Sequence, residues 1–436
     1  MSDYMFMLES HLSSEQSRVV TEVQAAAAEA NLNLFLTGGA MRDMLGGFPI
    51  RDLDFTVEGA APKLAKSIAQ RAGAVILASD EIRKSVELRF PSGVTAEIGM
   101  ARQQRVLKPG AKPQITPASI HDDLRNRDFT INAIALSLNR ASLGLLLDPT
   151  NGVSDLENRE LRAISNTGLY DDPVRILRLL RFRVRFGFGV HARTQSQYEN
   201  VRLAEVERHI PARALFGELR SIAEEPNAID VIKLLQEEKL LGLFSPALAG
   251  AKVNLPGLQK LQKVRAAIPF GSGFHAENLG LFLAVLTEKL TPRERTALVQ
   301  TTAMRPEEVE QWQKLEARAK KLEKDLVSAK VTRPSHIYKL LLAAPGELVL
   351  FLQLRSSQRM VHDRIRNFFN KYLPAAQEVS DQEVQASGAT PGTPEFQKLR
   401  QEIVAARLDG RTRKIPPAPL ATSVAATVSA GRSRAR

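Results

Sequence analysis

The stretch of residues 34–57 constrains the fold of this chain more than any other. Apolar residues 34–36 lead into Gly38 and Gly39, and a short helix follows. A strand that feeds a glycine turn and then a helix directs free backbone N–H groups and the positive end of the helix dipole at one spot. We therefore predict a phosphate-binding turn at these glycines, with Arg42 pointing into the same space.

The second half of this stretch supplies the opposite charge. Asp52 and Asp54 stand two residues apart, and the three residues that follow them favour a strand. Side chains two apart in a strand project from the same face. Adjacent carboxylates repel each other unless a proton or a cation lies between them, and oxygen ligands without cysteine or paired histidine suit Mg²⁺ or Mn²⁺. The combination predicts phosphoryl or nucleotidyl transfer, whereas the Asp-Leu-Asp pair alone would favour a surface strand with solvated side chains.

Strand signals occur only in the first 140 residues. The further runs that we predict as strands are residues 74–78, 84–90 and 94–98. If the last of them lies beside the strand of Asp52 and Asp54, Glu97 becomes a third carboxylate, able to hold the metal-bound 3′-hydroxyl or accept its proton. The alternative is a solvent-facing position in an alternating strand. Residues 103–119, which contain three prolines, are predicted to form a long loop.

A second informative segment starts at Tyr170. We expect Asp171 or Asp172 to cap a helix whose first turn contains Pro173. At helical spacing one side of it is apolar, and the other side carries Arg175, Arg178, Arg181 and Arg185. Because no acidic residue of the same helix neutralises these arginines, we expect them to face a polyphosphate or an RNA backbone rather than solvent alone. Beyond residue 220 the pattern is almost wholly helical.

Charge and composition narrow the class of protein. The net charge of +12 over 436 residues indicates a polyanionic partner such as nucleic acid. Half of this excess lies in residues 411–436, which hold six basic and no acidic residues and have the composition of a disordered tail. The absence of cysteine excludes disulfides and thiolate zinc sites. Because we find no signal peptide and no apolar run of about 20 residues, we expect a cytoplasmic protein with no membrane partner.

Five motifs, taken in order, resemble the class II tRNA nucleotidyltransferase and bacterial poly(A) polymerase family. They are Gly38-Gly39-x-x-Arg42-Asp43 with Asp52-x-Asp54; Arg127-Asp128-Phe129-Thr130-x-Asn132; Asp148-Pro149-x-x-Gly152-x-x-Asp155-Leu156; Asp171-Asp172-x-x-Arg175-x-x-Arg178-x-x-Arg181-Phe182; and Glu207-Arg208 with Glu218. The resemblance covers roughly residues 30–225. It implies an α+β fold, in which an N-terminal polymerase-beta-like nucleotidyltransferase domain with a mixed sheet precedes an all-helical neck, body and tail. The implied segments are a catalytic head at 1–140, a neck with the nucleotide-selecting motif at 141–222, a body at 223–300, an RNA-binding tail at 301–410 and a disordered basic tail at 411–436.

The resemblance also implies residue roles. Asp52 and Asp54 would bind two Mg²⁺ ions, with Glu97 as a further catalytic carboxylate. Asp172 and Arg175 would pair with the base edge of CTP or ATP. The other implied nucleotide-binding residues are Gly38, Gly39, Arg42, Arg127, Asp128, Asn132, Arg178 and Arg181. The expected activity is template-independent addition of CCA, or of its terminal nucleotides, to tRNA 3′ ends from CTP and ATP. The alternatives are a poly(A) polymerase and a catalytically silent RNA-binding protein, and the sequence predicts no oligomeric state.

Some positions depart from the family pattern. Asn126 stands where an arginine is usual, Asn151 where a glycine is usual and Asp171 where a glutamate is usual. Residues 103–106 lack the acidic and aromatic side chains of the loop that helps the family switch from CTP to ATP. This last departure bears on which nucleotides of the CCA end the protein adds.

Overall fold

The computed structural model describes residues 3–105, 114–269 and 272–410 and contains two compact units. The first unit comprises Met1–Ala266 and Glu277–Leu315, and the second comprises Ala267–Ala276 and Glu316–Arg436. The predicted disordered tail at 411–436 lies outside the described residues. The division into head, neck, body and tails stays a prediction.

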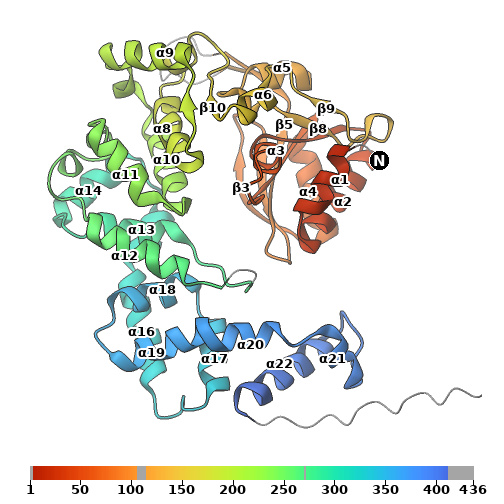
Figure 1. Cartoon of the computed structure of the whole chain (residues 1–436), viewed down its shortest axis with the longest axis vertical. Helices are drawn as coiled ribbons and strands as arrows, with labels where there is room; N and C mark the ends of the chain where they lie inside the picture. The colour runs from red at the N-terminus through yellow and green to blue at the C-terminus, as the bar shows by residue number, and fades with distance from the viewer. Residues whose placement is uncertain (1–2, 106–113, 270–271, 411–436) are drawn as a thin grey trace, which may run out of the picture. The chain divides into compact units, whose positions relative to one another are not determined.

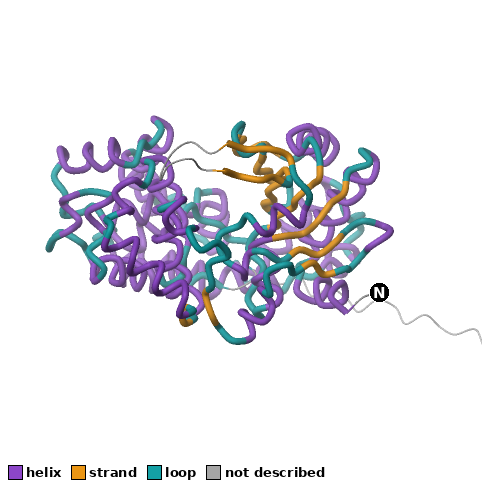
Figure 2. The backbone as a smooth tube through the Cα atoms, turned by 90° about the horizontal axis from the view of Figure 1, so that it is seen from above, coloured by secondary structure: helices purple, strands orange, loops and turns teal. Residues whose placement is uncertain are grey.

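A seven-stranded mixed sheet forms the centre of the N-terminal part, in the order β3-β4-β5-β2-β1-β8-β9 (Figure 1). Its strands are β1 (Asn33–Thr37), β2 (Leu53–Glu58), β3 (Val75–Asp80), β4 (Ser85–Arg89), β5 (Thr95–Met100), β8 (Ala135–Ser137) and β9 (Leu146–Leu147). Strands β2 and β5 pair in parallel, and the other neighbours in this sheet are antiparallel. In Figure 2 these strands gather in one part of the molecule, while helices make up most of the rest. The predicted order of a mixed sheet followed by helices is confirmed.

Helices cover the sheet because their apolar residues recur at helical spacing. Helix α2 (Ser14–Glu29) begins at a capping box formed by Ser13 and Gln16. It packs against β1 and against α4 (Ala61–Ala72). Helix α4 in turn packs over β4 and β5 and buries its own Leu64 and Ile68. The other α-helices up to residue 171 are α1 (Asp3–His11), α3 (Gly38–Leu45), α5 (Ile120–Arg125), α6 (Gly152–Glu157) and α7 (Gly168–Asp171).

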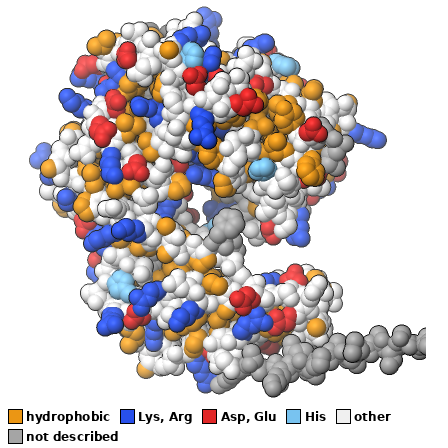
Figure 3. All heavy atoms as spheres, in the orientation of Figure 1, with side chains coloured by type: hydrophobic (Ala, Val, Ile, Leu, Met, Phe, Trp, Pro, Cys, Tyr) orange, Lys and Arg blue, Asp and Glu red, His pale blue; other side chains and the backbone are white. Residues whose placement is uncertain are grey.

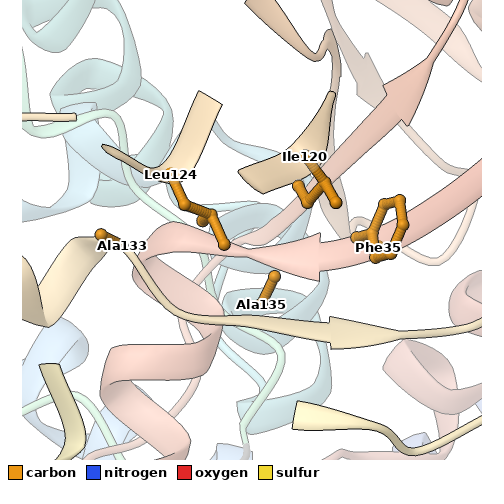
Figure 4. Close-up of a cluster of buried hydrophobic side chains, with 5 residues drawn as sticks. All are labelled: Phe35, Ile120, Leu124, Ala133 and Ala135. Carbon is orange, nitrogen blue, oxygen red and sulfur yellow. The ribbon is translucent and has the colours of Figure 1, made fainter. Parts of the chain in front are cut away.

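A small apolar cluster fixes the segment that follows α5. Phe35 from β1, Ile120 and Leu124 from α5, and Ala133 and Ala135 pack together (Figure 4). Leu124 is fully buried, which stabilises the fold by about 1.5–3 kcal/mol for a side chain of this kind. The cluster therefore holds residues 120–135, with several predicted site residues, against β1 and β8.

The prediction of a loop over 103–119 is wrong at both ends of this range, where the structure has strands. Strands β6 (Arg102–Arg105) and β7 (Gln114–Pro117) form an antiparallel pair, and residues 106–113 lie outside the described part. The pair escaped prediction because its residues are mostly polar, so they show no alternation of buried and exposed side chains. Another two-stranded sheet pairs β10 (Glu160–Leu161) with β11 (Gly189–Val190).

Beyond residue 220 the described chain is helical, as predicted. The helices that complete the first unit already start at residue 174. They are α8 (Val174–Phe186), α9 (Ala192–Leu203), α10 (Ala212–Glu224), α11 (Ala228–Glu237), α12 (Leu255–Ala266), α13 (Asn278–Leu286), α14 (Pro292–Thr301) and α15 (Pro306–Gln313). Helix α10 packs against both α8 and α13. The chain breaks at Lys314, between α15 and α16 (Leu315–Val327).

The second unit is built from short helices. After α16 they are α17 (Pro334–Ala343), α18 (Gly346–Arg355), α19 (Arg359–Asn367), α20 (Leu373–Gln377), α21 (Asp381–Ala386) and α22 (Pro394–Leu408). Phe274, Phe368 and Phe369 contact one another in its core. Among the described residues no single helix is long and apolar enough to cross a membrane; α17 and α18 reach that length only together, and they are bent by 114°.

Candidate active site

Three carboxylates predicted from the sequence meet at the junction of β2 and β5. The parallel register places Asp54 opposite Glu97. Asp52 directly precedes β2, and its Oδ1 accepts a hydrogen bond from the Thr95 hydroxyl at 2.7 Å. The condition that we set for Glu97, a strand beside that of the two aspartates, is therefore met. Thr95 was missed, although a parallel pairing of the two strands would have placed it opposite Asp52.

The electrostatics of this junction favour a cation. Burial, followed by the charges of Glu97 and Asp52, raises the pKa of Asp54 from 3.8 to about 7. Among the described residues no group of three histidine, cysteine, aspartate or glutamate side chains has the geometry to hold a metal alone. Mg²⁺ is usually held through one or two carboxylates, with substrate phosphates and water completing its shell. The oxygen donors of Asp52 and Asp54 fit such an ion.

The glycine turn packs directly on this carboxylate. Helix α3 begins at Gly38, whose φ of +62° favours glycine. The Gly39 N–H donates to Asp54 Oδ2 at 2.9 Å. A Cβ at Gly39 would lie 2.9 Å from that oxygen, and one at Gly38 would lie 3.0 Å from Arg127 Nη1. Both glycines are therefore required by the close approach of two charged side chains.

Arg42 lies beside the turn but is not free for a phosphate. Its side chain is only 5% exposed and lies over the rings of Phe182 and Phe186, 5.3 and 4.9 Å from their centroids. Its nitrogens already have acceptors in Asp43 and Asn132. Arg42 does point toward the turn, since its Nη2 would lie 3.4 Å from a Cβ at Gly39, but the same guanidinium is used to pack α3 against α8.

The segment after α5 brings Arg127 to the same place. Its guanidinium donates to Asp123 Oδ2 at 2.8 Å and to the hydroxyls of Thr37 and Thr56 at 3.2 and 3.1 Å. Its side chain stays 22% exposed, so part of it is accessible beside Gly38. Arg127 is thus fixed by β1, β2 and α5 together.

Asp128 is bound by α8 and by Asn132. Asp128 accepts from Asn132 Nδ2 at 2.9 Å and from Arg178 Nη1 at 2.7 Å. Although burial opposes ionisation, Arg178 and then Arg175 hold the pKa of Asp128 well below its usual range. Asp128 is therefore a carboxylate that fastens the segment after α5 to α8.

The start of α8 differs from the prediction. Neither Asp171 nor Asp172 caps the helix, whose N-cap position is Pro173. Asp171 instead accepts from the Thr167 hydroxyl at 2.6 Å, and Asp172 pairs with Arg175 at 3.3 Å. Arg175 Nη1 also donates to the carbonyl of Arg127 at 3.3 Å. The pair of Asp172 and Arg175 thus adjoins Arg127, whose guanidinium lies beside Gly38.

The basic face of α8 is neutralised by the protein itself, so the expectation of an unpaired ridge was wrong. Glu218 of α10 accepts from Arg178 and Arg181 at 3.0 Å each. Arg181 is 7% exposed and also pairs with Glu225, so it has no free face for a nucleotide. These acids lie on other elements, and no local sequence signal marks Glu225. On the face drawn in Figure 3, Lys and Arg side chains are likewise interspersed with Asp and Glu.

A third motif locks the turn that carries Asn132. Asp148 accepts from the N–H groups of Gly152 and Val153 at 2.7 and 2.9 Å, which starts α6. The departure at Asn151 is accommodated, because its φ of +60° is a conformation that asparagine adopts more readily than most residues. Gly152 then packs against the backbone at residue 130, so the motif has a structural role in the folded protein.

Comparisons with known proteins agree with these motifs. Residues 34–162 match the family model described as the poly A polymerase head domain. The chain is 30% identical over 284 residues to a CC-adding tRNA nucleotidyltransferase of Deinococcus radiodurans, which covers 64% of this chain and 72% of that protein. It is 29% identical over 367 residues to an A-adding tRNA nucleotidyltransferase of Halalkalibacterium halodurans, with 82% and 81% covered.

Other relatives are longer than this chain. The chain is 32% identical over 263 residues to an A-adding tRNA nucleotidyltransferase of Aquifex aeolicus, which covers 59% of this chain but only 31% of that protein. It spans 47% of the A-adding enzyme of Geobacter sulfurreducens. Relatives of this kind use a divalent metal ion.

Solved structures support the fold. A CCA-adding enzyme in an apo form aligns with a TM-score of 0.53 at 23% identity, covering 95% of this chain and 96% of the other. A Thermotoga maritima CCA-adding enzyme in complex with tRNA aligns with a TM-score of 0.51 at 22% identity, covering 94% and 96%. At this identity the likeness is evidence for the fold alone.

Proposed function

The chain belongs to the class II tRNA nucleotidyltransferase and bacterial poly(A) polymerase family, and from that premise we propose that it adds CCA, or the terminal nucleotides of CCA, to tRNA 3′ ends. The substrates in this proposal are CTP, ATP and the tRNA, and no template is needed. The observation that carries it is the register of Asp54 opposite Glu97, beside the turn at Gly38 and Gly39. This places carboxylate oxygens suited to a divalent cation directly beside the glycine turn, whose Gly39 N–H orients Asp54.

We propose Mg²⁺ as the cofactor, held by Asp52 and Asp54. When bound, Mg²⁺ neutralises triphosphate charge and makes the RNA 3′-hydroxyl a better nucleophile. Thr95 orients the carboxylate of Asp52 through its hydroxyl. Glu97 is exposed and adjoins Asp54, so it is placed to accept the proton of the 3′-hydroxyl.

The nucleotide is read on the other side of Arg127. Asp172 supplies acceptors and Arg175 supplies donors, which together match the edge of cytosine or adenine. Their mutual contact of 3.3 Å is long for a charge-assisted hydrogen bond and is readily exchanged for a base edge. Arg127 faces the triphosphate and ribose. Asp128 and Asn132 act with Arg178 to hold the segment in place, and Arg42 and Arg181 position α3 and α8.

Incorporation of labelled nucleotides tests the proposal directly. Purified protein is incubated with Mg²⁺, each labelled nucleotide in turn, and tRNA that ends before CCA or after CC. Incorporation of C and then A supports CCA addition, and A alone on the CC end supports addition of the terminal nucleotide. Long A tracts would instead support a poly(A) polymerase. Retained tRNA binding without incorporation would contradict the enzyme and support a silent RNA-binding protein.

The remaining expectations form part of the same proposal. The helical tail at 301–410 holds the tRNA, and a cytoplasmic location suits a chain without cysteine whose substrate is tRNA.

A further inference from the structure

A closed ring of charged side chains joins α3, the turn at Asn132, α8 and α10. In order its members are Asp43, Arg185, Glu225, Arg181, Glu218, Arg178, Asp128, Asn132 and Arg42, which returns to Asp43. Arginines and acids are equal in number, so the ring is neutral. Its acids are 1–8% exposed, and at such depth breaking one pair leaves a charge without water to replace its partner.

Glu225 is the member of this ring that also reaches the catalytic strand. Its Oε2 accepts from Arg51 Nη1 at 3.2 Å, and Arg51 directly precedes Asp52. The other oxygen of Glu225 accepts from Arg181 at 3.1 Å. The backbone of Glu225 is held as well, since its carbonyl accepts from Arg265 of α12 at 3.1 Å. Glu225 is therefore fixed at its backbone and at its carboxylate. One carboxylate oxygen binds α8 through Arg181, and the other binds Arg51, just before β2.

We propose that Glu225 is a positioning residue that ties β2, through Arg51, to α8. It keeps the carboxylates at 52 and 54 at a constant separation from the pair of Asp172 and Arg175. The inference rests on the proposed function, in which metal and base are held by different elements. A misplacement of about 1 Å in such a site lowers a rate by up to about 10²-fold, so the two elements need a rigid connection.

Arg51→Gln in the full chain tests this connection with little disturbance of the fold, because the Arg51 side chain is 36% exposed. We expect kcat for incorporation to fall about 3- to 10-fold while KM for the nucleotide changes less than about twofold. A second readout needs no turnover. It is the affinity for a non-hydrolysable ATP or CTP analogue, measured with and without Mn²⁺. In the variant, the increase in analogue affinity that Mn²⁺ confers should be at least about threefold smaller than in the parent protein. The affinity measured without metal should be unchanged.

Arg213→Gln is the matched control. It removes the guanidinium that donates to Glu308 at 2.7 and 2.8 Å, in the first turn of α10, far along the helix from Glu225. Any effect common to both variants reports only a looser α10. Glu225→Gln should match or exceed the loss in Arg51→Gln, and the double variant should be no worse than Glu225→Gln alone.

The outcomes separate this inference from the proposed function. If Arg51→Gln behaves like Arg213→Gln in both readouts, or if the effects of Arg51→Gln and Glu225→Gln multiply, the positioning role is overturned. If the parent protein incorporates no nucleotide but Arg51→Gln still loses the Mn²⁺-dependent gain, the positioning role is supported and only the proposed reaction fails.

Discussion

Asp54 lies directly opposite Glu97 in the parallel pairing of β2 and β5, and the charges of Glu97 and Asp52 add to burial in raising the pKa of Asp54. Like charges at opposed positions destabilise a sheet, and partial burial of Asp54 adds to the cost. Such an arrangement persists in a fold when something else compensates for it. A divalent cation is the compensation that the donor set suits.

The first prediction concerns pH. Without metal, folded Asp54 has a pKa of about 7 and the unfolded chain has the ordinary value of 3.8. Between these values the folded state binds more protons, so the free energy of unfolding falls as pH rises. In EDTA the melting temperature of the parent, relative to that of Asp54→Asn, should fall between about pH 5 and about pH 8. Saturating Mg²⁺ should remove most of this relative fall, and an unchanged difference would contradict the cation site.

The second prediction concerns the metal ligands. Asp54→Ala should lower incorporation by at least about 10²- to 10³-fold, as removal of a transition-state stabiliser does, while tRNA binding stays nearly intact. A labelled-nucleotide assay and a filter-binding assay measure the two effects. Asp230→Ala is the control, because Asp230 is an exposed acid of α11 that pairs with Lys233. Surviving activity in Asp54→Ala would show that the metal assignment is wrong.

Local sequence signals identified the residues at the site better than their partners. The run of apolar residues into two glycines predicted β1 and α3, and the spacing of Asp52 and Asp54 placed both at the start of one strand. The position of Glu97 needed one further fact, the parallel pairing of β2 with β5, which no local pattern encodes. The partners that occupy the Arg42 guanidinium could not be predicted for the same reason, since Asn132 and the rings of α8 are distant in the sequence.

The arginines of α8 show where such reasoning stops. Their spacing placed them on one face, but the acids that neutralise them come from α3, α10 and the turn after α5. A helix examined alone therefore looked like a nucleic-acid surface. The polar pairing of β6 with β7 was missed because it contributes almost no apolar burial.

The third prediction concerns base selection. Arg175→Ala should blur the choice between C and A more than it weakens triphosphate binding, because the guanidinium supplies the donors that read the base edge. The ratio of kcat/KM for CTP and ATP measures this effect. Arg193→Ala is the control, since Arg193 is an exposed arginine of α9 that bonds only a backbone carbonyl. An unchanged ratio in Arg175→Ala would count against the templating role.

The fourth prediction concerns the ring. Glu218 is 3% exposed and joins Arg178 to Arg181. Glu218→Gln should lower the free energy of unfolding by about 3–5 kcal/mol, because a buried arginine loses its compensating charge. Urea denaturation measures the loss. Glu310→Gln, which removes an exposed partner of Lys314, should leave the midpoint unchanged, and a similar midpoint for both variants would show that the ring contributes little.

The last prediction concerns Gly152. A Cβ at this position would lie 2.2 Å from the carbonyl oxygen of Thr130, whose hydroxyl also donates to Asp155 at 2.6 Å. Gly152→Ala must therefore displace backbone on one side or the other, and overpacking of this kind costs about 1–3 kcal/mol. Gly217→Ala is the opposite case, because nothing lies within 4 Å of its Cβ in α10, and it should gain about 0.8–1.0 kcal/mol of stability. Since Asn132 follows Thr130 in the same turn, Gly152→Ala should also raise KM for the nucleotide, whereas Gly217→Ala should leave KM unchanged. Equal denaturation midpoints for the two variants would show that the contact between Gly152 and Thr130 does not constrain the turn.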